Sequence, residues 1–261
     1  MTSEGRLAGK AALVTGGSRG IGAEIVRRLA SDGADIAFTY NTGKAEADEV
    51  AASVRALGRG VLAIQADFAD VTAPAAVAGA ALSQLGRLDI LVNNAGVTFW
   101  RPIAQLDAES FDRIVAVDVR APLLLMKEAA GALSDGGRVI NIASGVTSSA
   151  VPGSSLYSGA KAFIDQLTRV AALEFAARRI TVNAVGPGST ATGPFADLPA
   201  DRLAEMGAAA FLLGRVGTPA DTAALVAFLV SDEASFITGQ VIYNTGGQRG
   251  PIGLDVTEYP Q

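Results

Sequence analysis

The chain of 261 residues is 49% hydrophobic and 18% charged, a composition that indicates a globular protein with a substantial core and excludes an intrinsically disordered one. Its net charge of −5 argues against a protein that binds nucleic acid or an anionic membrane by charge. It contains no cysteine and no histidine, which excludes a disulfide framework, a thiol nucleophile, a Ser-His-Asp triad and the usual zinc sites. Acid–base chemistry must therefore rest on Tyr, Lys, Asp or Glu, and the scattered carboxylates have no spacing that predicts a metal site.

Apolar runs of strand length alternate with helical patterns along nearly the whole chain. Strands are predicted at 11–15, 35–40, 61–66, 89–93, 138–142, 181–185 and 240–244. Helices are predicted near 21–31, 45–57, 74–85, 110–133, 155–178 and 219–231. Pro74 and Pro219 suit the first turns of two of these helices, and Thr218 suits the N-cap of the last one.

The predicted strands are rich in Val, Ile and Leu and alternate poorly, as expected for parallel strands that are covered on both faces. Strands that alternate with helices predict the α/β class: a single Rossmann-type, doubly wound domain whose seven-stranded parallel sheet is flanked by helices. We expect this domain to span 7–261. Within it, the long connection at about 186–214 is expected to be irregular and to form a substrate loop. The C-terminal tail 247–261 is expected to cover a sheet edge or a neighbouring subunit.

The first six residues lack the apolar core of a secretory signal, and 1–6 is expected to be a flexible N-terminal tail. No stretch reaches about 18 apolar residues free of charge, proline and glycine, so a transmembrane helix is not expected. We therefore expect a cytoplasmic protein whose partners include neither nucleic acid nor membrane.

A glycine-rich turn, Thr15-Gly16-Gly17-Ser18-Arg19-Gly20-Ile21-Gly22, follows the first predicted strand and opens the first predicted helix. Glycines allow a backbone to approach a pyrophosphate closely, and a helix N-terminus offers unpaired amides and a positive dipole. The spacing Gly-x-x-x-Gly-x-Gly differs from the standard Gly-x-Gly-x-x-Gly. A glycine-rich turn without a ligand is the alternative, but the strand–turn–helix context favours dinucleotide binding.

Tyr157 and Lys161 are separated by one helical turn in the predicted helix at 155–178, so their side chains share a face. There the ammonium stabilises the phenolate form of the tyrosine, which makes proton transfer near neutral pH efficient. The spacing alone is weak because Tyr-x-x-x-Lys also occurs by chance on exposed helices. It gains weight because other motifs lie along the chain in the order that one dehydrogenase fold requires.

From Leu7 to Gly247 the chain resembles the classical short-chain dehydrogenase/reductase family. The motifs that carry the resemblance are the glycine-rich turn, Asp67 after the third strand, Asn93-Asn94-Ala95-Gly96 after the fourth, Ser144 ahead of Tyr157 and Lys161, Pro187-Gly188 with Thr192, Leu213-Gly214-Arg215-Val216-Gly217-Thr218-Pro219, and Phe236-Ile237-Thr238-Gly239-Gln240. The resemblance implies an NADP(H)-dependent oxidoreductase that interconverts a ketone and a secondary alcohol.

The resemblance also implies a catalytic set of Ser144, Tyr157 and Lys161, with Asp118 as a fourth member. In reduction, Tyr157 would give its proton to the substrate oxygen as hydride arrives from the nicotinamide, and Ser144 would hydrogen-bond the same oxygen. Lys161 would hold the nicotinamide ribose and stabilise the phenolate. Asp118 stands where the family usually has an asparagine that supports a water relay to the lysine. Because an aspartate accepts the same hydrogen bonds but donates none, Asp118 preserves the relay, retunes Lys161 or is structural; we favour a preserved relay of altered strength.

The end of the second predicted strand indicates the choice of cofactor. An NAD enzyme usually places an acid there to bind the ribose 2′-hydroxyl, whereas this chain has Tyr40-Asn41-Thr42. Arg19 can pair with a 2′-phosphate and Lys44 can donate to it, so we expect NADP(H) in preference to NAD(H); the alternative is that both are solvated surface charges. The residues expected to bind the cofactor are Gly16, Ser18, Arg19, Gly20, Ile21, Gly22, Tyr40, Asn41, Thr42, Asp67, Phe68, Asn94, Ala95, Gly96, Tyr157, Lys161, Pro187, Gly188, Thr190 and Thr192.

In the family that the chain resembles, three regions line the substrate pocket, and here their residues suggest a roomy and mostly apolar site. These are Phe99 and Trp100, the segment 148–155, and Phe195, Met206 and Phe211 in or near the long connection. The alternative for each residue is that it packs in the core or at a subunit interface.

We therefore expect an NADPH-dependent ketoreductase that acts on an apolar, cyclic or aromatic, polyketide-like ketone. The alternatives are a 3-oxoacyl-thioester (acyl-carrier-protein) reductase, an NADP-dependent sugar or alcohol dehydrogenase, and a non-catalytic dinucleotide-sensing protein. The resemblance further implies a homotetramer built through the helices at 110–133 and 155–178 and through the C-terminal strand and helix.

Overall fold

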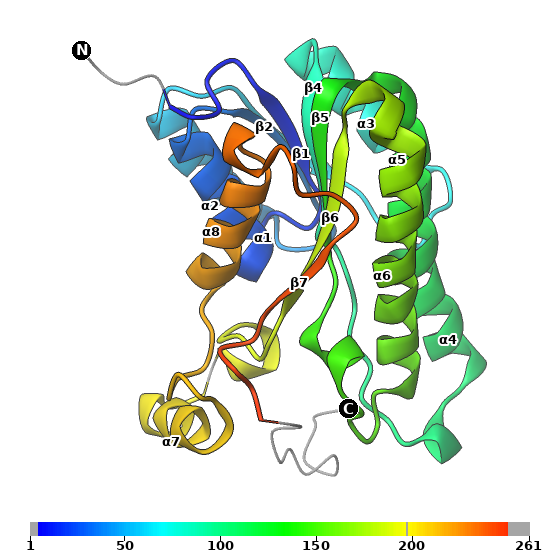
Figure 1. Cartoon of the computed structure of the whole chain (residues 1–261), viewed down its shortest axis with the longest axis vertical. Helices are drawn as coiled ribbons and strands as arrows, with labels where there is room; N and C mark the ends of the chain where they lie inside the picture. The colour runs from blue at the N-terminus through cyan, green and yellow to red at the C-terminus, as the bar shows by residue number, and fades with distance from the viewer. Residues whose placement is uncertain (1–4, 197, 250–261) are drawn as a thin grey trace.

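Parallel strands form one sheet at the centre of the molecule, as the sequence predicts (Figure 1). The computed structural model describes residues 5–196 and 198–249, and within them seven strands lie in the order β3-β2-β1-β4-β5-β6-β7. Every neighbouring pair is parallel. The strands are β1 (Ala11–Val14), β2 (Asp35–Tyr40), β3 (Val61–Gln65), β4 (Leu88–Asn93), β5 (Leu133–Ile142), β6 (Thr181–Pro187) and β7 (Val241–Asn244).

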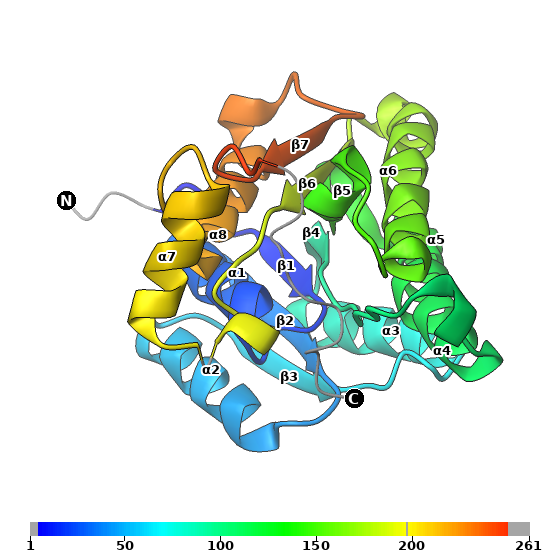
Figure 2. The same cartoon turned by 90° about the horizontal axis from the view of Figure 1, so that it is seen from below.

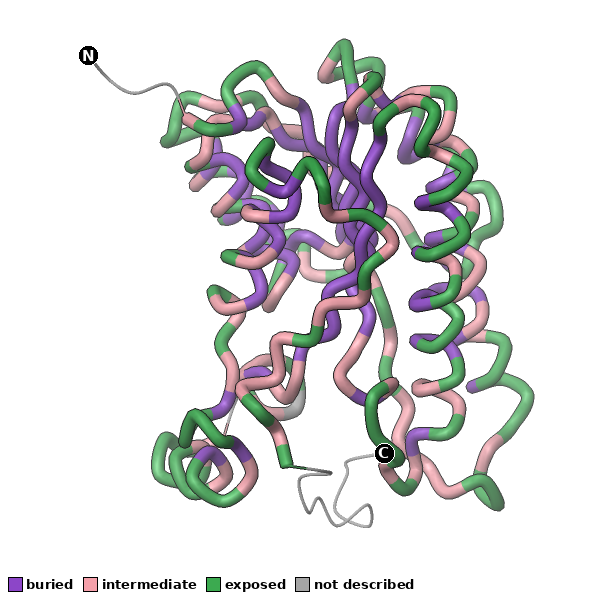
Figure 3. Tube along the Cα trace, viewed as in Figure 1, coloured by how far each residue is buried: buried purple, intermediate pink, exposed green. Residues whose placement is uncertain are grey.

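Helices cover both faces of the sheet. One apolar core joins the sheet to α1, α2 and α8, and a second core on the opposite face joins it to α3, α5 and α6 (Figure 1). All of β4 is buried, which explains why the strands do not alternate between apolar and polar residues (Figure 3). The α-helices are α1 (Gly20–Ser31), α2 (Lys44–Ala56), α3 (Ala73–Leu85), α4 (Ala108–Ile114), α5 (Ala121–Ala132), α6 (Ser155–Phe175), α7 (Ala200–Ala210) and α8 (Pro219–Leu229).

Two helix starts follow the sequence signals that predicted them. Pro74 lies in the first turn of α3, and Pro219 lies in the first turn of α8. Thr218 is the N-cap of α8, where its backbone N–H and its hydroxyl both donate to Asp221 Oδ2, at 2.7 and 2.8 Å. These contacts satisfy polar groups at the helix start that would otherwise lack a partner.

The helix predicted at 110–133 is interrupted. α4 continues into a π-helical turn, η2 (Val115–Arg120), and α5 follows from Ala121. Single π-helical turns shift the side chains of a helix and are frequent at functional sites, and η2 carries Asp118. β5 also begins earlier than predicted, at Leu133, because its pairing with β4 contains a register shift between Leu88 and Ile90.

The connection at 186–214 is not wholly irregular, so that prediction was wrong in part. It contains the short turn η5 (Gly193–Phe195) and the helix α7, which Pro199 precedes as N-cap. In Figure 2 α7 lies on the side of α1 and α8, away from α4, α5 and α6. The connection therefore places a helix beside the carboxyl ends of the strands.

Most of the two predicted tails lies outside the described residues, which exclude 1–4 and 250–261. The described start of the C-terminal tail packs against the end of α7, because Gln248 bridges to Phe211 and Arg249 N–H donates to Ala210 O at 2.8 Å. None of the helices in the described ranges is long and apolar enough to span a membrane.

Candidate active site

A cleft of about 1850 Å³ lies at the carboxyl ends of the strands. Its walls come from the segments that follow each strand, and it is centred where the strand order reverses between β1 and β4. Such a reversal is the usual ligand site of an open α/β sheet. Every residue that the sequence singles out for catalysis or cofactor binding lines this cleft, except Lys44.

The glycine-rich turn is held tightly between β1, β2 and α1. Gly16 N–H donates to Thr39 Oγ1 at 2.9 Å, and Gly17 N–H donates to Thr39 O at 2.7 Å. Gly22 has no room for a side chain, because an added Cβ would lie 2.1 Å from Gly16 O. The first turn of α1 carries no acidic residue, and the positive end of its helix dipole faces the cleft.

Thr15 and Asn94 join the ends of β1 and β4 across the strand reversal. Thr15 Oγ1 accepts the backbone N–H groups of Asn94 and Ala95, both at 2.9 Å. Asn94 Nδ2 donates to Thr15 O at 2.9 Å and to Gly16 O at 3.1 Å. Thr15 and Thr39 were not among the predicted site residues; their positions beside the glycine-rich turn and at the end of β2 were the available signals.

The end of β2 carries no carboxylate. Tyr40, Asn41 and Thr42 line the cleft there, while Asp35 lies at the opposite end of the strand, where Oδ1 accepts Gly60 N–H at 2.8 Å. Arg19 is exposed on the cleft wall and forms no ion pair with any residue in the described ranges.

Lys44 does not reach the cleft. It is absent from the cleft lining and pairs instead with Asp48, at 2.6 Å. Its predicted contribution to cofactor binding is therefore not supported.

Asp67 meets Arg113, a residue that the sequence did not single out. Asp67 Oδ1 accepts the N–H of Ala69 and the Arg113 guanidinium, both at 2.9 Å. The Ala69 hydrogen bond, with Arg113, holds the pKa of Asp67 below its ordinary value. Asp67 therefore stays ionised at the edge of the cleft that is nearest β3.

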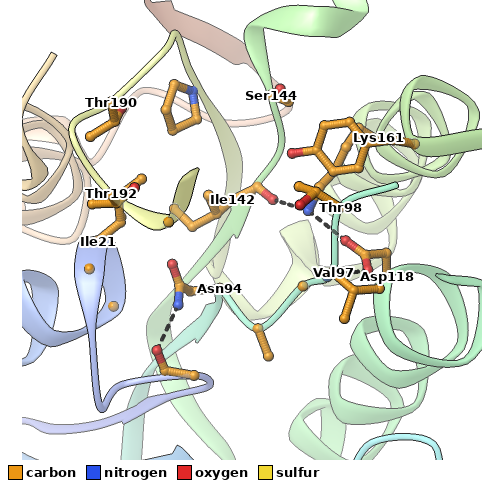
Figure 4. Close-up of a pocket in the computed structure, with 18 of the residues that line it drawn as sticks. Ile21, Asn94, Val97, Thr98, Asp118, Ile142, Ser144, Lys161, Thr190 and Thr192 are labelled. Atoms are coloured by element: carbon orange, nitrogen blue, oxygen red, sulfur yellow. Dashed lines mark hydrogen bonds and ion pairs between the residues drawn. The ribbon is translucent and has the colours of Figure 1, made fainter. Parts of the chain in front are cut away.

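Lys161 and Asp118 form a buried ion pair (Figure 4). Lys161 Nζ lies 3.0 Å from Asp118 Oδ1 and donates to Ile142 O at 3.1 Å, while Asp118 Oδ2 accepts Val97 N–H at 2.8 Å. Burial alone would lower the pKa of Lys161, but the charge of Asp118, with a smaller contribution from Tyr157, outweighs it and raises that pKa. Lys161 is therefore held as an ammonium.

Tyr157 lies one turn before Lys161 on α6, and Lys161 Nζ is 5.7 Å from the centroid of the Tyr157 ring. The Trp100 ring lies near that of Tyr157, with ring centroids 6.0 Å apart and planes tilted by 45°. Ser144 follows β5, and its Oγ accepts Val146 N–H at 3.3 Å. Because that bond uses a lone pair, the hydroxyl hydrogen of Ser144 is available for a ligand in the cleft.

Behind the ion pair lies a second, small cavity of about 10 Å³, lined by Thr15, Asn93, Asp118 and Lys161 among others. This volume is near the lower limit for one water molecule. Four of its lining residues are polar and the other eight are apolar, so it offers a single water only a few polar partners beside Lys161.

Only part of the predicted substrate wall lines the cleft. Phe99, Trp100 and Phe195 do, together with Ser148, Ser149, Val151 and Pro152 from the 148–155 segment. Met206 and Phe211 do not, and Phe211 is buried against the C-terminal segment. In the described ranges no group of three or more Asp or Glu side chains is placed to hold a metal ion.

Comparison with known proteins identifies the family. A family model described as "Enoyl-(Acyl carrier protein) reductase" matches residues 16–249. The short-chain dehydrogenase/reductase from Serratia marcescens has 40% sequence identity and a TM-score of 0.85, covering 93% of this chain and 98% of that one. The chain belongs to the short-chain dehydrogenase/reductase family. This short-chain dehydrogenase/reductase is therefore an oxidoreductase with a Rossmann-type sheet.

Two further relatives of this short-chain dehydrogenase/reductase carry more specific names. The hydroxynaphthalene reductase-like protein Arp2 of Metarhizium brunneum is 36% identical over 255 residues, covering 92% of this chain and 95% of Arp2. The angucycline C-6 ketoreductase LanV with bound NADP is 38% identical and has a TM-score of 0.86, covering 93% of this chain and 96% of that one.

Proposed function

We propose that the protein reduces a ketone to a secondary alcohol with NADPH, and that Tyr157 is the proton donor. The observation that carries this proposal is that Ser144, Tyr157 and Lys161 line the same cleft as the glycine-rich turn. A protein that only sensed a dinucleotide would not need these three side chains together.

The cleft residues fit a dinucleotide that carries a 2′-phosphate. The close approach of Gly22 to Gly16 leaves the N-terminus of α1 open to a pyrophosphate. Exposed Arg19, together with Asn41 and Thr42, would hold the 2′-phosphate, since no carboxylate stands at that end of β2. The NADP bound to LanV supports the same choice.

The remaining cleft residues would contact the other parts of the cofactor. Asp67 and Phe68 would contact the adenine. Lys161 would hold the nicotinamide ribose, and the segment 187–192 would hold the carboxamide. When bound, NADPH supplies a hydride for the carbonyl carbon of the substrate.

Proton transfer depends on the protein's own side chains. Tyr157 gives its phenolic proton to the carbonyl oxygen, and Ser144 donates a hydrogen bond to that oxygen while negative charge develops on it. The Lys161 ammonium stabilises the phenolate that Tyr157 becomes. Asp118 keeps that ammonium charged and in place through the contact at 3.0 Å.

The substrate that we propose is an apolar cyclic or aromatic ketone of the polyketide type. The cleft that Tyr157 lines has apolar walls from Phe99, Trp100, Val146, Val151 and Phe195. The names of Arp2 and LanV, a hydroxynaphthalene reductase-like protein and an angucycline ketoreductase, support an aromatic substrate.

The proposed activity is tested by following NADPH and NADH oxidation with a bicyclic aromatic ketone, an acetoacetyl thioester and a simple cyclic ketone, and by following NADP+ and NAD+ reduction with a sugar. We expect the largest kcat/KM with NADPH and the aromatic ketone. A preference for the thioester would indicate acyl-chain reduction instead. A preference for NADH would overturn the cofactor assignment.

We also propose that the protein assembles as a homotetramer. Apolar side chains are exposed along α4, α5 and α6, at Phe111, Leu123, Phe163 and Val170, and a second copy would cover them. Light scattering on the purified protein measures the mass directly, and a monomeric mass would overturn the assembly.

A further inference from the structure

A buried carboxyl group and two hydroxyl groups meet behind Ser144, outside the contacts already described. Asp165 lies on α6, Tyr243 on β7, and Thr147 on the short turn η3 (Gly145–Ser148) that follows Ser144. Tyr243 Oη lies 3.4 Å from Asp165 Oδ2 and 2.9 Å from Thr147 Oγ1. Thr147 Oγ1 lies 3.0 Å from Ser144 O. The three side chains thus connect α6 and β7 to the backbone of Ser144.

The position of Tyr243 is fixed by the backbone of β6. At Gly186, an added Cβ would lie 2.5 Å from Tyr243 Cδ1, so the ring packs directly on the glycine. Only a residue without a side chain permits this contact. The ring of Tyr243 is partly exposed, and its hydroxyl lies between Asp165 and Thr147.

The contacts need more hydrogens than the two hydroxyl groups carry. Three oxygen–oxygen contacts run from Asp165 through Tyr243 and Thr147 to Ser144 O, whereas Tyr243 and Thr147 supply one hydrogen each. When Asp165 is ionised, Tyr243 donates to it, and the single Thr147 hydrogen must go to Asp165, Tyr243 Oη or Ser144 O. A proton on Asp165 supplies the third hydrogen, and each of the three contacts is then a hydrogen bond.

The surroundings of Asp165 favour that proton. Burial raises the pKa of Asp165, and the Thr147 hydrogen bond, Arg169, Tyr243 and Lys161 oppose the rise without cancelling it. Lys161 and Arg169 lie on α6 itself, while Tyr243 and Thr147 reach it from β7 and η3. In addition, Asp165 Oδ1 is buried and accepts no hydrogen bond from the residues in the described ranges.

We propose that Asp165, Tyr243 and Thr147 are positioning residues for Ser144: a proton on Asp165 completes a hydrogen-bonded chain that fixes the Ser144 carbonyl and, with it, the turn that carries the Ser144 hydroxyl. This inference rests on the proposed role of Ser144 in ketone reduction. Loss of the proton leaves the Thr147 hydrogen divided among Ser144 O and its other acceptors, and loosens the turn. Reduction then slows as pH rises through the titration of Asp165.

The test is the pH dependence of kcat and KM for ketone reduction at saturating NADPH. A net hydrogen bond corresponds to a change of about two- to tenfold, so we expect kcat of the wild type to fall by this factor as Asp165 ionises. Asp165→Asn donates to Tyr243 at every pH, and Tyr243→Phe leaves Thr147 with Ser144 O as its acceptor. Both variants should lose this fall, whereas Asp112→Asn, at an exposed carboxyl on α4, should retain it.

Thr147→Val removes the bond to Ser144 itself, so we expect kcat to drop about two- to tenfold at all pH values, with KM for NADPH preserved. Thr147→Ser restores the hydroxyl and should recover the wild-type kcat. A Thr147→Val variant with wild-type kcat, or an Asp165→Asn variant that keeps the wild-type fall, would overturn the inference.

Thermal unfolding separates this inference from the proposed function, because it needs no turnover. The Tm of Asp165→Asn relative to the wild type should rise with pH as the buried carboxyl of the wild type ionises. Parallel curves of Tm against pH for the two proteins would overturn the proposed hydrogen-bonded chain, even if ketone reduction is confirmed. Diverging curves would support it even if the wild type reduces none of the ketones offered.

Discussion

Lys161 Nζ and Asp118 Oδ1 lie 3.0 Å apart, and the Asp118 side chain is completely buried. The family usually has an asparagine at this position, so the charge of Asp118 is a departure from the family pattern, and Lys161 is its structural partner. An unpaired charge is costly to bury, so removing one partner of a buried ion pair leaves the other charge uncompensated and destabilises the protein. The stability of the protein therefore depends on the buried Lys161 ammonium keeping its counter-charge.

Replacing Asp118 by asparagine should destabilise the protein. The variant leaves the buried Lys161 ammonium without a counter-charge, which should lower the free energy of unfolding by about 3 kcal/mol, or roughly 6 to 12 °C in Tm. Chemical denaturation and calorimetry measure both quantities. Glu205→Gln is a matched control, because the Glu205–Arg202 pair is exposed and should contribute less than about 1 kcal/mol. Equal stability of Asp118→Asn and the wild type would show that the pair contributes nothing.

Replacing Arg19 by alanine should weaken the binding of NADPH but not of NADH. A charge-assisted hydrogen bond to the 2′-phosphate corresponds to about 10- to 100-fold in Kd. Fluorescence titration of both cofactors gives the two values. Lys44→Ala is the control, since Lys44 pairs with Asp48 and does not line the cleft. Equal losses for NADPH and NADH would assign Arg19 to a different contact.

Replacing Trp100 by alanine should reduce the preference for aromatic ketones. The Trp100 ring lies 6.0 Å from that of Tyr157, where it can stack on an aromatic substrate. We expect kcat/KM for a bicyclic aromatic ketone to fall about tenfold, and that for a small cyclic ketone to change much less. Ile103→Ala, at an exposed position outside the cleft lining, should affect neither substrate. An equal loss for both ketones would mean that Trp100 supports the site without selecting the substrate.

The paired groups at the start of β4 should make stability depend on acidity. Burial of Asp89 acts to raise its pKa, but hydrogen bonds from Arg87, at 2.7 Å, and from Ala11 N–H outweigh it and lower that pKa below 3.8. The stability that Asp89 contributes is therefore present at pH values above the ordinary carboxyl pKa. It is lost as the pH falls through the lowered pKa of Asp89.

Asp89→Asn should lower the free energy of unfolding at neutral pH by about 2 kcal/mol, with a smaller difference in acid. Urea denaturation across acidic pH checks this, and a difference that grows in acid would contradict it.

The order of strands and helices could be predicted because each strand is a short apolar run flanked by turn residues, and because β4 is buried on both faces. The helix α7 was missed because the prolines and glycine around 193–199 predict a loop, and because Gly207 is the one buried residue of this helix. The π-helical turn η2 leaves no local signature, because its residues are as helical in pattern as those on either side.

The candidate site was predictable where a motif sits in one segment, as in the glycine-rich turn or in Tyr157 and Lys161. It was not predictable where contacts join distant segments. Thr147 and Tyr243 meet only because β7 packs beside β6, a relationship between residues far apart in the chain. For Asp118, the resemblance already indicated Lys161 as its neighbour, but the direct ion pair between them became visible only in the structure.

The most direct test of ketone reduction at this cleft compares the wild type with Tyr157→Phe at neutral pH, following NADPH oxidation with a bicyclic aromatic ketone and NADPH binding by fluorescence. Removal of the proton donor should lower kcat by about 100-fold or more while NADPH still binds. A Tyr157→Phe variant that turns over at the wild-type rate would contradict the role of Tyr157 and, with it, the proposed mechanism.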